Sequence, residues 1–168
     1  MYYNDYFKGF SDDSRVWIYP SSRALSAAET TEITEALVNF CDEWTAHDKK
    51  LRAAGEILHQ RFIVLMVDES RAGASGCSID ASVRFIQNLE NKYDISLLDR
   101  LTLGCRTHAG IRLLNKAGVL AGLDAGEINL ETPVFNNLVT RKAQWVSEWE
   151  IPLKMSWVAR FVKQPAGR

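Results

Sequence analysis

The alternation of apolar and polar residues predicts three strands in the first half of the chain. Residues 14–19 alternate with period two and stop at Pro20, a pattern that is typical of a short strand. Residues 62–67 are all apolar, which predicts a strand that is covered on both faces. Residues 56–59 are expected to pair with it across a tight turn near Gln60, although one long bent strand fits the same pattern.

Two helices are predicted to alternate with these strands. The first begins at a capping box, in which the side chains of Ser26 and Glu29 each bond the other residue's backbone N–H. Apolar residues then recur at helical spacing and predict one buried face: Ile33, Ala36, Leu37, Phe40, Cys41 and Trp44. The second helix carries a similar face: Ile79, Val83, Ile86, Leu89 and Tyr93. Residues 101–106 predict a further strand.

The resulting order of elements is that of the ferredoxin-like (βαββαβ) arrangement. We therefore expect an α+β fold with a ferredoxin-like core over about residues 14–107. Residues 108–168 are expected to form a Trp-rich C-terminal α/β extension, and the whole chain, 1–168, to be a single domain. The extension has three predicted elements: a short helix within 113–123, an edge strand at 132–135 and a helix over 141–150.

The loop formed by residues 73–80 is the segment whose composition most suggests chemistry. Its two glycines permit positive φ and a close approach of the backbone to a ligand. Ser78 is expected to cap the second helix, which places Asp80 in the first helical turn. Backbone N–H groups at such a helix start suit a small anionic ligand. The predicted ligand-binding residues are Gly73, Ser75, Gly76, Cys77, Ser78 and Asp80.

Cys77 supports a second interpretation of the same loop. A thiol at a helix N-terminus is stabilised as the thiolate, which makes Cys77 a candidate nucleophile. Such a mechanism needs a base within hydrogen-bond reach, and His59, beside the central strand, is the best placed of the three histidines. Helix capping alone also explains a loop rich in glycine and serine. These residues leave open whether the chain is an enzyme, and they favour a non-catalytic role.

The C-terminal segment carries basic and aromatic residues together. Its aromatic residues are Trp145, Trp149, Trp157 and Phe161, and its basic residues are Arg141, Lys142, Lys154, Arg160, Lys163 and Arg168. Tryptophan and arginine are enriched in binding hot spots, so an alternative function is a non-catalytic module for a protein partner or self-association. The other interpretation is that the aromatic side chains pack back onto the core, because tryptophan is mostly buried in proteins.

Composition and charge narrow the choice of partners. The 168 residues are 46% hydrophobic and 24% charged, which is typical of a globular protein, and a net charge of −1 argues against nucleic acid as a partner.

No apolar run approaches the roughly 20 residues that span a membrane. Three scattered cysteines fit a reducing compartment, so we expect a cytoplasmic location. Cys105 and His108 lack a second ligand pair, so we expect neither a metal nor a cofactor.

Five segments together resemble an uncharacterised family of short bacterial proteins that are often labelled "ABC transporter ATPase". They are residues 15–19, 61–64, 68–70, 73–80 and 134–139. The resemblance covers nearly the whole chain, and its most specific part is the Ser-Gly-Cys-Ser-Ile-Asp stretch within the 73–80 loop. The label implies an ATPase-associated function. The sequence itself contains neither a Gly-x-x-x-x-Gly-Lys-Ser/Thr loop nor a Gly-x-Gly-x-x-Gly motif to hold nucleotide phosphates.

Overall fold

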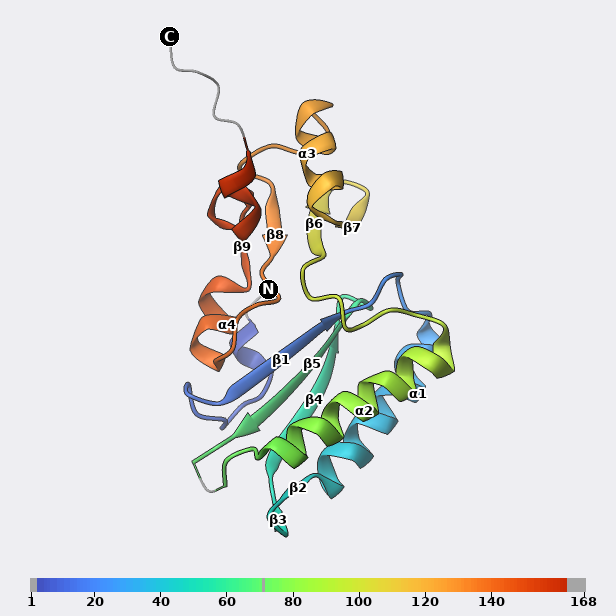
Figure 1. Ribbon diagram of the computed structural model, residues 1–168, viewed down its shortest axis with the longest axis vertical. Helices are drawn as coiled ribbons and strands as arrows, with labels where there is room; N and C mark the ends of the chain where they lie inside the picture. Colours follow the sequence, from blue (N-terminus) through green and yellow to red (C-terminus); the bar gives the residue numbers. More distant parts are fainter. Residues whose placement is uncertain (1–2, 71, 163–168) are drawn as a thin grey trace.

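The computed structural model describes residues 3–70 and 72–162, and these form a mixed α+β fold, as predicted (Figure 1). The strands make a three-stranded sheet, a four-stranded sheet and a short two-stranded hairpin, each antiparallel. In chain order the elements are η1 (Tyr3–Asp5), β1 (Arg15–Pro20), α1 (Ala27–Glu43), β2 (Thr45–Ala46), β3 (Lys49–Lys50), β4 (Arg52–Leu58), β5 (Phe62–Asp68), α2 (Gly76–Tyr93), β6 (Leu103–Thr107), β7 (Gly110–Leu114), α3 (Lys116–Asp124), β8 (Pro133–Phe135), α4 (Lys142–Glu148), β9 (Glu150–Pro152), η2 (Leu153–Met155) and η3 (Trp157–Phe161).

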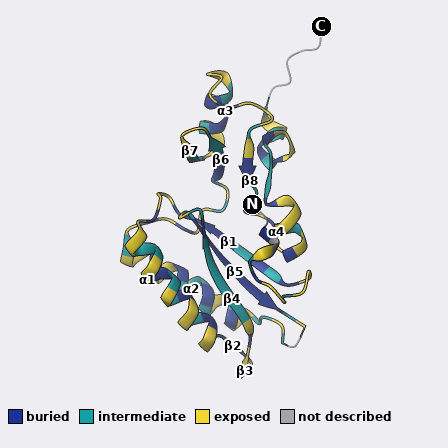
Figure 2. Cartoon of the chain, turned by 180° about the vertical axis from the view of Figure 1, so that it is seen from behind, coloured by how far each residue is buried: buried dark blue, intermediate teal, exposed yellow. Residues whose placement is uncertain are grey.

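The first sheet has the strand order β1-β5-β4, and its central strand is buried along its whole length (Figure 2). Alternate residues of β5 pack into two different hydrophobic cores. Ile63 and Leu65 pack with apolar residues of α1 and α2, whereas Phe62, Val64 and Met66 pack with η1 and α4 on the other face. The prediction of a strand covered on both faces is therefore confirmed.

A tight turn joins β4 to β5, so the prediction of two paired strands is confirmed and the alternative of one bent strand is wrong. His59 and Gln60 occupy the turn with positive φ angles of 55° and 52°. The Arg61 backbone N–H donates to the Leu58 carbonyl oxygen at 3.0 Å and closes the turn. Two successive residues with positive φ are typical of a type I′ hairpin turn, whose twist matches that of the flanking strands.

The ferredoxin-like core is not confirmed, because β6 belongs to the second sheet. That sheet has the order β7-β6-β8-β9, so β6 pairs with strands of the C-terminal extension and not with β1. The outer edge of β1 instead meets the backbone of Thr140, whose carbonyl oxygen accepts a hydrogen bond from the Val16 N–H at 3.0 Å. The boundary predicted near residue 107 consequently falls inside a sheet.

The prediction that residues 132–135 form an edge strand is also wrong. β8 lies between β6 and β9. It accommodates a proline because only Val134 and Phe135 are in register with β6, while Pro133 stands opposite Pro152 of β9. A proline at the first residue of a strand removes no hydrogen bond from the central ladder.

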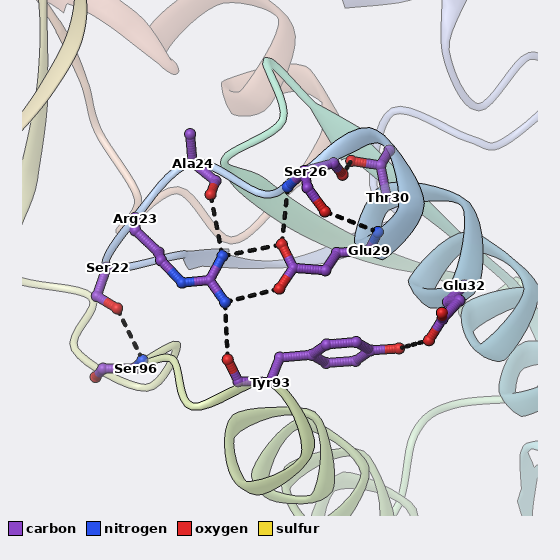
Figure 3. A network of polar contacts seen from close by, with 9 residues as sticks. All are labelled: Ser22, Arg23, Ala24, Ser26, Glu29, Thr30, Glu32, Tyr93 and Ser96. Carbon is purple, nitrogen blue, oxygen red and sulfur yellow. Dashed lines mark hydrogen bonds and ion pairs between the residues drawn. The ribbon is translucent and has the colours of Figure 1, made fainter.

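The predicted capping box at the start of α1 is present within a larger polar network (Figure 3). Glu29 accepts a hydrogen bond from the Ser26 N–H at 2.8 Å. Its carboxylate also accepts hydrogen bonds from both terminal nitrogens of Arg23, at 2.9 and 2.7 Å. The hydrogen bonds from Arg23 lower the pKa of Glu29 to about 2. Arg23 also donates to the Tyr93 carbonyl oxygen at 2.8 Å, so the network ties the start of α1 to the end of α2.

Candidate functional site

The 73–80 loop enters α2 three residues earlier than predicted. Ser75, and not Ser78, is the N-cap: its side-chain oxygen accepts from the Ser78 N–H at 3.2 Å, while the Ser78 hydroxyl oxygen accepts from the Ser75 N–H at 2.7 Å. This reciprocal serine pair satisfies both backbone donors and allows the helix to begin at Gly76. Asp80 therefore lies beyond the first turn, which contains no acidic residue.

The carboxylate of Glu69, which precedes the loop, holds the loop in place. The Ala74 N–H donates to Glu69 Oε1 at 3.1 Å, so this backbone donor already has an anionic partner. Two arginines flank the same carboxylate, with Arg15 Nη1 at 3.8 Å and Arg141 Nη1 at 3.3 Å. Two guanidinium groups therefore face this one carboxylate at the base of the loop.

The structure does not bring Cys77 and His59 together. Cys77 is exposed near the start of α2, beyond the C-terminal end of β5, whereas His59 precedes the N-terminal end of that strand. A seven-residue strand spans about 20 Å, which is far outside hydrogen-bond reach. The other two thiols are buried, and burial raises the pKa of Cys41 to about 12 and that of Cys105 to about 11.

His59 instead belongs to a polar cluster between the two sheets, together with Tyr3, Arg106 and Glu150. The Tyr3 hydroxyl donates to Glu150 Oε2 at 2.7 Å, and its oxygen lies 3.2 Å from His59 Nε2. Arg106 binds the Glu150 carboxylate through two nitrogens, with Nε–Oε1 at 2.5 Å and Nη2–Oε2 at 3.0 Å. Since Tyr3 gives its one proton to Glu150, His59 Nε2 carries the hydrogen in the bond to Tyr3.

Burial and charge fix the protonation states of this cluster. Burial raises the pKa of Tyr3, and the hydrogen bond to Glu150 raises it further. Burial also opposes ionisation of Glu150, but the hydrogen bonds from Arg106 and Tyr3 outweigh it and lower the pKa of that carboxyl. The pKa of His59 is lowered by burial and by the charge of Arg106. Near neutral pH, Tyr3 and His59 are therefore uncharged, and Arg106 and Glu150 neutralise one another.

A recess of about 500 Å³ opens beside the cluster, and we call it the Arg61 recess. It is lined by Ala24, His59, Gln60, Arg61, Arg106, Ala109, Gly110 and Ile111. None of these lining residues is acidic. Arg61 is half-buried, and within the described chain its guanidinium makes no ion pair and no hydrogen bond. Burial lowers the pKa of Arg61, because withdrawal from water disfavours its charge.

The sequence pointed to His59 as a candidate site residue, but not to the residues that surround it. Tyr3 and Glu150 are 147 positions apart, and Arg106 lies 44 positions before Glu150. No local spacing connects these residues, because their contact depends on how the second sheet docks against the first. The sequence does give one sign of this site: Arg61 is a charged residue that stands directly before six apolar ones.

Two of the three C-terminal tryptophans lie inside the protein. Trp145 and Trp149 have no exposed surface, which confirms that their side chains pack back onto the core. Trp157 is half-buried against a separate core that lines the second sheet, and Phe161 is 39% exposed. Lys142 is buried as well, and Lys163 and Arg168 lie outside the described residues. An interaction surface in this segment would therefore rely on Trp157, Phe161 and the exposed side chains of Arg141, Lys154 and Arg160.

Among residues 3–70 and 72–162, no three His, Cys, Asp or Glu side chains are grouped so that they could hold a metal ion. No helix in the same ranges is both long and apolar enough to cross a membrane. No protein-family model, no curated protein and no solved structure matches this chain.

Proposed function

We propose that the protein binds a small anionic molecule, bearing a carboxylate or a phosphate group, in the Arg61 recess. The observation that carries this proposal is the half-buried Arg61 guanidinium, which lines the recess and has no partner within the described chain. Withdrawing a charge from water is costly unless an opposite charge compensates for it. The planar guanidinium matches carboxylate and phosphate groups through paired hydrogen bonds. A bound anion would supply the missing partner.

The neighbouring groups favour binding over catalysis. Arg106 is held by Glu150, so the two contribute no net charge, and Arg61 gives the recess an excess of one positive charge. Arginine has five N–H donors, and Glu150 engages two of those on Arg106, so others remain for a ligand. His59 is neutral with its hydrogen on Nε2, which leaves Nδ1 as an acceptor for a ligand hydroxyl.

The test is a titration with inorganic phosphate, acetate and succinate, followed by NMR chemical shifts and by calorimetry. We expect saturable binding to the parent protein and an affinity at least about tenfold lower in Arg61→Gln, because a hydrogen-bonded charge pair is lost. Arg84→Gln is the matched control, since it removes the same charge from an exposed position on α2. Equal affinities of the parent and Arg61→Gln would refute the proposed site.

The 73–80 loop is the second proposed location for the same function. The observation that favours it is the pair of arginines, Arg15 and Arg141, which flank Glu69, the carboxylate that accepts from the Ala74 N–H of this loop. Arg141→Gln therefore forms the second arm of the titration. Binding that survives Arg61→Gln but weakens at least about tenfold in Arg141→Gln would assign the anion to this loop.

A further inference from the structure

β4 has an open edge. It pairs with β5 on one side, and within the described residues no strand pairs with its other side (Figure 1). The opposite edge of the sheet is different, because Thr140 accepts a hydrogen bond from Val16 of β1, and that strand ends at Pro20. Natural sheets often protect an open edge with proline, a bulge, charged side chains or a covering segment. β4 has neither proline nor a bulge, so its free main-chain groups suit pairing with another strand.

β4 is less buried than the strand with which it pairs. Its five central residues, Ala53 to Ile57, are all half-buried, in contrast with the fully buried β5. Gly55 is the informative position because it has no side chain. The Leu37 side chain covers its face so closely that a Cβ atom would lie 2.9 Å from Leu37 Cδ2. The surface that Gly55 still exposes therefore belongs to its main-chain atoms.

The charges of β4 are complementary to those of a second, antiparallel β4. Arg52 and Glu56 are four residues apart and thus lie on the same face of the strand. If two copies pair antiparallel about Ala54, each Arg52 stands directly opposite Glu56 of the other copy. The residues between them, Ala53 and Gly55, are small and stand opposite one another, so no bulky side chain obstructs the pairing.

We propose that the open edge of β4 binds β4 of a second copy of this chain, which joins the two three-stranded sheets across a twofold axis. The pairing would be isologous, as in most closed dimers, and would use the main-chain groups that the single chain leaves unpaired. The identical strand is favoured over an unrelated one because each copy brings both members of the charge pair.

Glu56 gives independent support to this pairing. Its carboxylate is half-buried, and within residues 3–70 and 72–162 it has no ion-pair partner. Burial raises its pKa, as expected for a carboxyl that lacks a compensating charge. In the dimer, Arg52 of the other copy would neutralise it. Arg52 already binds Asp68 at 3.1 Å and the Gly9 carbonyl oxygen at 2.9 Å, but its five donors leave capacity for Glu56.

Sedimentation velocity over a dilution series tests the self-association. We expect the mass to rise with concentration from 19.0 kDa toward twice that value. Glu56→Arg places two arginines face to face, so its dimer dissociation constant should rise at least about tenfold. Glu35→Arg, which makes the same charge change on the exposed surface of α1, is the control and should dimerise like the parent. A protein that stays monomeric, or a dimer that Glu56→Arg does not weaken, would overturn the proposal.

Disulfide trapping tests the register independently of charge. In a Cys77→Ser background, Ala54→Cys places two thiols on directly opposed residues, about 5 Å apart between Cα atoms, which is within the range of a disulfide. Mild oxidation should therefore give a covalent dimer. Ile57→Cys is the control, because its two copies would lie about 20 Å apart along the paired strands. No covalent dimer from Ala54→Cys, or equal yields from both variants, would contradict the proposed register.

Discussion

Gln60 holds a backbone conformation that favours glycine. Its φ of 52° lies in the left-handed region, where a Cβ atom costs roughly 1–2 kcal/mol. We expect Gln60→Gly to raise the free energy of unfolding by about 1 kcal/mol, measured by urea denaturation. Gln60→Ala keeps the Cβ atom and serves as the control, because it should give no such gain. If both variants had the same stability, strain at this turn would not be the cause.

At the scale of single residues, burial was predictable where the sequence pattern was unbroken and not where it depended on distant partners. The six apolar residues of 62–67 predicted a buried strand, and β5 is buried throughout. Trp145 and Trp149 were expected to be buried as tryptophans usually are, but a surface role was also open, because basic residues surround them in the sequence. Their burial depends on Tyr3 and Phe7, which pack with them from the other end of the described chain.

The start of α2 is held by one pair of serines, which makes it sensitive to a single substitution. Ser75→Ala removes the hydroxyl that caps the Ser78 N–H and should lower the free energy of unfolding by about 1 kcal/mol. Thermal unfolding followed by circular dichroism measures the change. Ser96→Ala is the control, since Ser96 is exposed and contributes backbone hydrogen bonds alone in the described structure. An unchanged melting temperature in Ser75→Ala would show that the cap contributes nothing.

At the scale of elements, helix starts and strand positions were easier to predict than sheet membership. The Ser26 and Glu29 pattern located the start of α1 correctly because both capping partners are local. The start of α2 was misplaced by three residues, because Ser75 and Ser78 can each serve as a cap. The strand at β6 was anticipated, but its place beside β7 and β8 required long-range pairing that no local pattern records.

At the scale of the whole molecule, the Tyr3, His59, Arg106 and Glu150 cluster links the stability of the sheet junction to pH. The pKa values of Glu150 and His59 are both lowered in the folded protein. Their contribution is therefore complete above the unfolded-state values, about 4.3 for Glu and about 6.5 for His, and is lost as pH falls through the lower folded-state values. We expect the free energy of unfolding to decline progressively as the solution is acidified below about pH 6.

Glu150→Gln tests the carboxylate's part in this decline. The variant should be less stable than the parent at neutral pH, since Arg106 loses its partner, and its stability should fall less steeply on acidification. Glu148→Gln is the control, because that neighbouring carboxylate is exposed and makes no ion pair within the described residues. Denaturation curves at a series of pH values give the comparison. Parallel pH profiles for the parent and Glu150→Gln would exclude Glu150 as the titrating group.

The hydrogen bond between Tyr3 and Glu150 also has a consequence for the nascent chain on the ribosome. Its two residues are 147 positions apart in the chain. Since synthesis adds roughly 5–20 residues per second, Glu150 is made many seconds after Tyr3. Meanwhile β1, β4 and β5 can already pair, but the sheet face that Trp145 and Trp149 later cover remains bare and apolar. During this interval, before α4 and β9 emerge, the exposed apolar surface makes the chain prone to aggregation.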